Sequence, residues 1–179
     1  METLLGFSRA IDRLNKKFAA LADYAVLIAV FISAGNATIR YLLNYSSNGL
    51  LEVQWYLFAA TVMLGTSYTL RMNGHVRVDL FYSSVSDRSR LYIDISGIIL
   101  FLLPVIGYLT YLTTPFFLRS FASGEMSMNA GGLVLWPAKL MLPLGFALLW
   151  LQGVSELIKR VAALKGMVSL DTSYEKPLQ

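Results

Sequence analysis

Four long apolar blocks constrain the fold of this chain more than any other sequence feature. They occupy residues 18–43, 50–70, 91–118 and 132–157, and each reaches the roughly 20 residues that a helix needs to cross the hydrocarbon core of a bilayer. Within the blocks the apolar residues follow neither the 3.6-residue nor the 2-residue period of a half-buried soluble element. The sequence therefore predicts an all-α membrane protein with four transmembrane helices.

The basic residues predict how these helices are oriented. Lys and Arg accumulate in cytoplasmic segments of membrane proteins. All of them except Arg40, Arg119 and Lys139 lie before the first block, between the second and third, or after the fourth. We expect both termini and the middle loop to be cytoplasmic, with short outer loops near residues 45–49 and 119–131.

The two ends of the chain differ from the blocks. Residues 1–17 are expected to form an amphipathic helix in the plane of the membrane surface, residues 18–158 the four-helix transmembrane domain, and residues 159–179 a cytoplasmic tail that is mobile after Gly166. The apolar face of the first segment would consist of Leu4, Leu5, Phe7, Ile11, Leu14 and Phe18, opposite Arg9, Asp12, Arg13 and Lys16.

Ionisable residues within the blocks are functional candidates, because charge is costly in lipid. Asp23 and Asp94 lie near the cytoplasmic ends, where Arg71 or Arg90 could pair with them. Such pairing favours an architectural role over transport.

The outer half of the membrane holds a second polar group. Arg40 and Glu52 flank the first outer turn and could form an ion pair across a helical hairpin. Lys139 either snorkels outward along its stem or meets an acidic group on another chain, and we favour snorkelling.

The middle loop contains His75 and Asp79. A proton relay through His75 is conceivable because an unperturbed His titrates near pH 6.5, but a lone loop His more often makes hydrogen bonds. Asp79 could cap a short helical turn. The polar residues expected to be structural are Arg40, Glu52, Arg71, His75, Asp79 and Lys139.

Small residues recur every fourth position on the first two predicted helices. Such spacing lets helix backbones approach closely, which replaces the hydrophobic drive for association in lipid. At least one stripe is expected to be a helix contact, although Ala is also simply common in membrane helices. The stripes are Ala25, Ala29, Ser33 and Ala37 on the first helix, and Thr61, Gly65 and Thr69 on the second.

Several function classes are disfavoured by residue type. The absence of Cys and the single His exclude disulfides, thiolate sites and a bis-histidine haem, so no cofactor is expected. No nucleophile with its base, carboxylate pair or phosphate loop indicates an enzyme. The basic residues form no patch with interleaved aromatics for nucleic acid, and no midplane polar cluster suits a self-sufficient transporter. The residues alone thus indicate an accessory or scaffolding membrane subunit.

Several short motifs occur in a recognisable order along the four-block pattern. Together they resemble the small membrane subunit of the tripartite ATP-independent periplasmic (TRAP) transporters, the DctQ-like family, over residues 14–159. The motifs are Glu52, Gln54 and Trp55 at the start of the second helix, Arg71, His75, Val76, Val78 and Asp79 after its end, and the stretches 124–133 and 143–146.

The resemblance implies a bacterial inner-membrane complex. In that family a periplasmic binding protein delivers an organic anion to a large permease subunit driven by a sodium gradient, and the small subunit is a scaffold that helps to dock the binding protein. The outer loops would then contribute Tyr45, Asn48, Arg119 and Glu125 to docking. The alternative is a stand-alone channel or small transporter that uses Lys139, Asp23 and Glu52 as its polar path.

Overall fold

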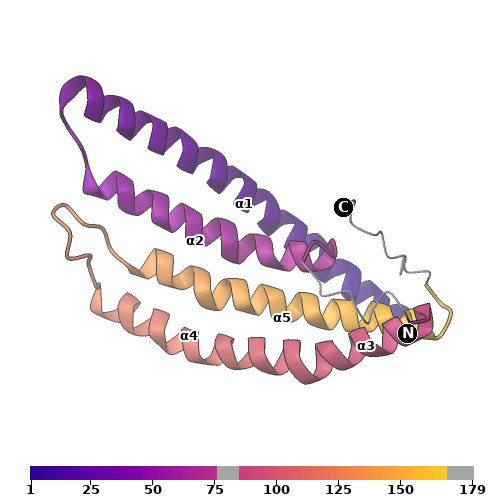
Figure 1. Cartoon of the computed structure of the whole chain (residues 1–179). Helices are drawn as coiled ribbons and strands as arrows, with labels where there is room; N and C mark the ends of the chain where they lie inside the picture. The colour runs from indigo at the N-terminus through magenta and orange to yellow at the C-terminus, as the bar shows by residue number, and fades with distance from the viewer. Residues whose placement is uncertain (76–84, 169–179) are drawn as a thin grey trace.

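The computed structural model describes residues 1–75 and 85–168, and this part of the chain is helical throughout apart from its connecting loops. Asp79 and the tail after residue 168 lie outside it. Two helical hairpins, α1–α2 and α4–α5, form the molecule (Figure 1). The elements are α1 (Glu2–Leu43), α2 (Asn48–Arg71), α3 (Asp87–Gly97), the π-helix η2 (Ile98–Leu102), α4 (Leu103–Ser123) and α5 (Trp136–Leu164).

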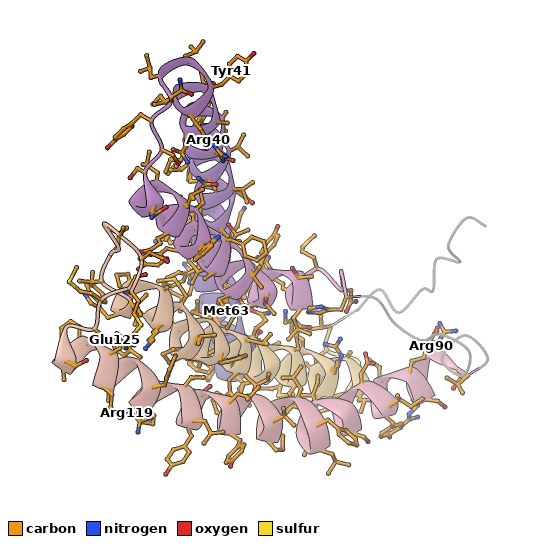
Figure 2. The ribbon with its side chains drawn as sticks, turned by 60° about the vertical axis from the view of Figure 1, so that its left-hand side comes forward. Arg40, Tyr41, Met63, Arg90, Arg119 and Glu125 are labelled. Carbon is orange, nitrogen blue, oxygen red and sulfur yellow. The ribbon has the colours of Figure 1, made fainter. Side chains whose placement is uncertain are left out.

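Helix α5 is the centre of the arrangement. It packs against α1, α2, α3, η2 and α4, while α1 packs mainly along α2. In α5, 39% of the most apolar stretch is buried. The corresponding share is 17% in α1 and 6% in the continuous helix formed by α3, η2 and α4. In Figure 2 the α1–α2 hairpin stands at an angle to the α4–α5 hairpin. The apolar faces of α1 and α4 are consequently exposed.

Three helices of the described chain are long and apolar enough to cross a membrane: Glu2–Leu43, Asp87–Ser123 and Trp136–Leu164. Helix α2, which contains the predicted span 50–70, is not among them. Its first two turns contain Asn48, Glu52 and Gln54, and its last residue is Arg71, so polar residues lie at both of its ends.

The first helix differs from the expectation of a separate surface helix over residues 1–17. Helix α1 runs unbroken through 42 residues. Ser8, Ile11 and Asn15 in its first turns are buried against α5, whereas Phe7 and Leu14 are exposed. The segment therefore presents a largely polar face to the bundle.

A π-helix lies between α3 and α4. The ring of Pro104 would clash with the carbonyl of Leu100 in a regular α-helix and has no amide to donate. The wider turn of η2, in which the amide of Leu103 donates to the carbonyl of Ile98, fits this need. The helix from Asp87 to Ser123 thus continues past the proline without a break.

The two hairpins approach each other closely at Gly145 in α5. A Cβ atom there would lie 2.6 Å from the Cβ and 2.7 Å from the carbonyl oxygen of Met63 in α2. A Cβ at Gly153 would lie 2.5 Å from the side chain of Leu102. Neither glycine belongs to the predicted stripes. Each is an isolated Gly inside an apolar helix, which is a signal of close backbone approach.

The small-residue stripe of α1 follows the contact with the bundle only in its first half. Ala25 is buried and Ala29 half-buried, but Ser33 and Ala37 are exposed. Residues spaced four apart advance by about 40° around a 3.6-residue helix at each step. The stripe therefore winds away from a straight line of contact.

On α2, the predicted stripe is half-buried along its length. A Cβ at Gly65 would lie 3.9 Å from the Cβ of Ala22 in α1. The hydroxyls of Thr61 and Thr69 donate to carbonyls of their own helix. Gly65 is therefore the member of this stripe that faces α1 most directly.

Candidate functional site

The loop between α4 and α5, residues 124–135, folds back as a short turn at one end of the molecule. The amide of Ser127 donates to the carbonyl of Leu133 and that of Leu135 to the carbonyl of Glu125, both at 2.9 Å. A Cβ at Gly132 would lie 2.7 Å from the Cβ of Ser127, so this close turn requires glycine. We call residues 124–135 the α4–α5 loop.

Glu52 fastens the α4–α5 loop to the start of α2. Its carboxylate accepts hydrogen bonds from the Ser127 hydroxyl, the Asn129 amide group at 2.8 Å and the backbone amide of Leu133 at 2.7 Å. Its side chain is enclosed, with 2% of the residue exposed. Hydrogen bonds to a charged acceptor are among the stronger ones in proteins, so Glu52 defines the conformation of the loop.

Two more residues of α2 hold the same loop. The side-chain amide of Asn48 donates to the carbonyl of Ala130 at 3.1 Å, and the Tyr56 hydroxyl donates to the carbonyl of Val134 at 2.7 Å. Asn48, which was predicted to lie at the docking surface, supports the loop in this structure. Tyr45, in the loop between α1 and α2, is exposed.

The expected ion pair between Arg40 and Glu52 is not formed. The α4–α5 loop supplies the three hydrogen bonds that Glu52 accepts. Arg40 lies on α1 near the end of the α1–α2 hairpin (Figure 2). The prediction paired the nearest opposite charges in the sequence, whereas loop donors that follow some 80 residues later satisfy the carboxylate.

Lys139 pairs within the chain and does not snorkel outward. Its ammonium group makes an ion pair with Glu125 of the α4–α5 loop and lies 4.3 Å from the ring centroid of Phe116. The hydrogen bond from Lys139 holds the pKa of the Glu125 carboxyl below its usual range. Arg119 is exposed and points away from α5 (Figure 2).

A polar network closes the opposite end of the bundle. The carboxylate of Asp12 in α1 accepts hydrogen bonds from Gln152 and Ser155 of α5, both at 2.9 Å, and lies 3.2 Å from the Lys159 ammonium. Asn15 donates to the side-chain oxygen of Gln152 at 2.7 Å. These contacts join the first turns of α1 to the last turns of α5.

The same network reaches α2 and α3. Arg71 at the end of α2 lies 3.8 Å from the Asp12 carboxylate, and Arg160 of α5 contacts Asp94 of α3 at 2.9 Å and Glu156 at 2.6 Å. Arg71 or Arg90 was expected to pair with Asp23 or Asp94; Arg71 instead lies against Asp12, and Asp94 contacts Arg160. The spacing of Gln152, Ser155, Glu156, Lys159 and Arg160 on one helix was the signal in the sequence that could have revealed this network.

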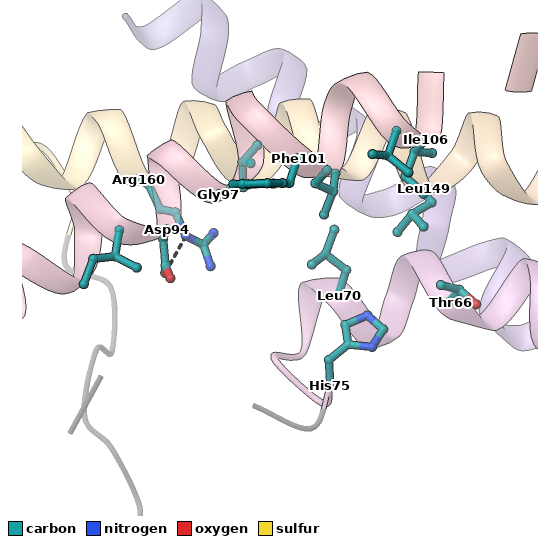
Figure 3. Close-up of a pocket in the computed structure, with 13 residues that line it drawn as sticks. Thr66, Leu70, His75, Asp94, Gly97, Phe101, Ile106, Leu149 and Arg160 are labelled. Atoms are coloured by element: carbon teal, nitrogen blue, oxygen red, sulfur yellow. Dashed lines mark hydrogen bonds and ion pairs between the residues drawn. The ribbon is translucent and has the colours of Figure 1, made fainter. Parts of the chain in front are cut away.

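An open cleft of about 660 Å³ lies beside this network, between α2, α5 and the helix that contains η2. His75 stands at one edge, across from Asp94 and Arg160 (Figure 3). Most of the wall is apolar, including Ile98 and Phe101. Within residues 1–75 and 85–168, no group of three or more His, Asp or Glu side chains could hold a metal ion.

These features define a multi-pass helical membrane protein whose internal polar groups join its own helices. Residues 29–163 match the family model of the tripartite ATP-independent periplasmic transporters, DctQ component. The chain belongs to this family, as the motifs around Glu52 and Arg71 indicated, and is therefore a transporter component. No curated protein and no solved structure matches it.

Proposed function

We propose that the chain is the small permease subunit of a sodium-driven TRAP transporter that imports an organic acid across the bacterial inner membrane. It serves as a scaffold beside the large permease subunit and helps to dock the periplasmic binding protein. The observation that carries this proposal is the use of its charged groups. Glu52, Asp12, Asp94 and Lys139 each hold parts of this chain together, while the apolar faces of α1 and α4 stay exposed.

The geometry favours the scaffold over a stand-alone transporter. The alternative needs Lys139, Asp23 and Glu52 to share a polar path. Lys139 and Glu52 instead bind to the α4–α5 loop, and Asp23 lies exposed on α1. A substrate path would need polar groups that face a common space across the bilayer.

The proposed topology has four crossings and both termini in the cytoplasm. Helix α2 has 24 residues and is about 36 Å long at 1.5 Å per residue, which exceeds the roughly 30 Å of hydrocarbon. Because it packs between α1 and α5, it shares their depth. Its polar ends, at Glu52 and Arg71, suit the two interfaces.

The α4–α5 loop is the proposed docking surface for the binding protein, together with Tyr45. Its internal hydrogen bonds and its attachment to Glu52 give it a defined shape. Arg119 and Glu125 provide charges of both signs at this end, of the kind that raise association rates more than affinity.

Reconstitution tests the proposal directly. The purified chain in vesicles with an inward sodium gradient should take up no carboxylate, whereas the chain with its large permease and binding protein should. Arg119→Glu in the complete system should slow uptake at low binding-protein concentration and leave the membrane complex intact. Sodium-dependent uptake by the chain alone would instead favour the small-transporter alternative.

A further inference from the structure

A polar groove lies between α1 and α2 near the end that carries their connecting loop. It has a volume of about 500 Å³, and it is set in two helices whose other exposed residues are mostly apolar. Most of the residues that line it carry an amide, hydroxyl or guanidinium group, beside an apolar surface. The residues that line it are Ser33, Asn36, Ala37, Arg40, Tyr41, Asn44, Leu51 and Gln54.

Asn36 forms the deeper part of this groove. It is 7% exposed, and its side chain makes no hydrogen bond with any residue in the described part of the chain. Asn36 lies seven residues before the end of α1 at Leu43, about 10 Å along the helix axis. An amide without a partner at that depth in lipid is costly, so the groove calls for a polar occupant.

Arg40 lies one helical turn nearer the loop, about 6 Å from Asn36 along the axis. It is exposed and takes part in none of the ion pairs among residues 1–75 and 85–168. Glu52, the nearest acid in the sequence, is held by the α4–α5 loop. Figure 2 shows Arg40 and Tyr41 together near the tip of the hairpin.

We propose that this groove binds one membrane phospholipid. The phosphodiester lies against the guanidinium of Arg40, which matches phosphate geometry with paired donors, and an ester carbonyl accepts from the amide of Asn36. The exposed Tyr41 suits the level of the headgroups.

The two polar levels favour a lipid over an acidic side chain from a partner subunit. A carboxylate on Arg40 would leave the amide of Asn36, one turn deeper, without a partner. In a phospholipid, the ester carbonyls lie about one helical turn deeper in the membrane than the charged phosphate, and the apolar chains lie deeper still. It can therefore supply an acceptor to both Arg40 and Asn36. The small side chains of Ser33 and Ala37 leave room for such a molecule beside α1.

Native mass spectrometry of the full-length chain provides the test, with delipidated protein in mild detergent titrated with phosphatidylethanolamine. The wild type should retain one lipid. Arg40→Gln and Asn36→Leu should each weaken retention at least about tenfold, because each removes one of the two polar contacts. Arg40→Lys should retain most of the binding. The matched control is Arg119→Gln, which removes another exposed cation at the same end of the molecule and should bind like wild type.

Several results would overturn the proposal. Equal losses of lipid binding in Arg40→Gln and Arg119→Gln would indicate general attraction of lipid to positive charge. Unchanged binding in Asn36→Leu would show that Asn36 does not contact the lipid. Displacement of the lipid by inorganic phosphate would assign the groove to a free anion. Absence of the lipid from the complex with the permease would assign it to the partner subunit. Circular dichroism checks the helical content of Asn36→Leu. If this variant loses helical content, Asn36→Ser takes its place.

Discussion

Glu52 shows how a single carboxylate in a membrane helix becomes part of the architecture. It is enclosed, accepts from two side chains and one backbone amide, and links the start of α2 to the α4–α5 loop. A carboxylate only accepts hydrogen bonds, whereas the amide that would replace it in Gln carries a donor. The donors that surround Glu52 therefore select the charged form.

The first prediction concerns this selection. In Glu52→Gln, one end of the side chain becomes a donor that faces other donors, so the α4–α5 loop should loosen while α2 stays folded. Amide hydrogen exchange at Leu133, whose N–H donates to Glu52, should become faster. Asn48→Ala removes one bond to the same loop and should have a smaller effect. Equal protection of Leu133 in wild type and Glu52→Gln would contradict the assignment.

The second prediction concerns pH. The folded-state pKa of Glu125 is lowered by the hydrogen bond from Lys139, so the pair stabilises the fold above the ordinary carboxyl pKa of about 4.3. This stabilisation is lost as the pH falls through the lower pKa of the folded state. Wild type should unfold at a higher temperature than Glu125→Gln at pH 7, and the difference should disappear toward pH 3. A difference that is constant over this range would exclude the ion pair as its source.

Among the elements, α5 combines close packing on one part of its surface with a polar network at its end. The apolar blocks located the helices well, because length and hydropathy are local properties of the sequence. They did not show that α5 continues to Leu164 or that α1 begins at Glu2. Those extensions are polar, and they join the bundle because Asp12 of α1 pairs with Gln152 and Lys159 of α5. Arg160 of α5 pairs with Asp94 of α3.

The third prediction tests the close approach of α2 and α5. Gly145→Ala places a methyl group against the backbone of Met63, so the helices must move apart, at a cost of about 1–3 kcal/mol. Gly35→Ala in α1 is the matched control, because its Cβ meets nothing within 4 Å, and it should be neutral or stabilise by up to about 1 kcal/mol. Thermal unfolding in detergent compares the two. Similar midpoints for both variants would mean that the helices do not meet at Gly145.

At the scale of the molecule, local sequence patterns predicted the helices but not the contacts between them. Ser8 bonds to Ser155, and Glu52 to Leu133. Spacing on α5 can mark a polar face that includes Ser155, but it does not name the partner on α1. The predicted pairs joined neighbours in the sequence, such as Arg40 with Glu52, and the structure satisfies Glu52 from a distant loop instead. Short-range charge proximity was a poor guide because the bundle brings remote helices together at both of its ends.

The fourth prediction concerns topology, and the absence of native Cys makes it simple to test. Single cysteines at Thr3 and Asp87 should resist a membrane-impermeant maleimide added from the periplasmic side, while those at Ser46 and Ser123 should react. The reason is the concentration of Lys and Arg at the end with Thr3 and Asp87. Labelling of Thr3→Cys from the periplasm would mean that the orientation is reversed or that the chain crosses the membrane fewer than four times.

The attachment of Glu52 to a loop 75 to 81 residues later has a consequence for biosynthesis. A ribosome that has delivered only α1 and α2 to the membrane has produced a hairpin with a carboxylate whose three partners do not yet exist. Asp12 likewise awaits Gln152 and Lys159 at the other end. The end of the hairpin at Glu52 is thus completed by the α4–α5 loop, and the end at Asp12 by α5, which is translated after that loop. Chains that terminate before Trp136 should therefore remain targets for membrane proteases, although most of their apolar sequence has already been inserted.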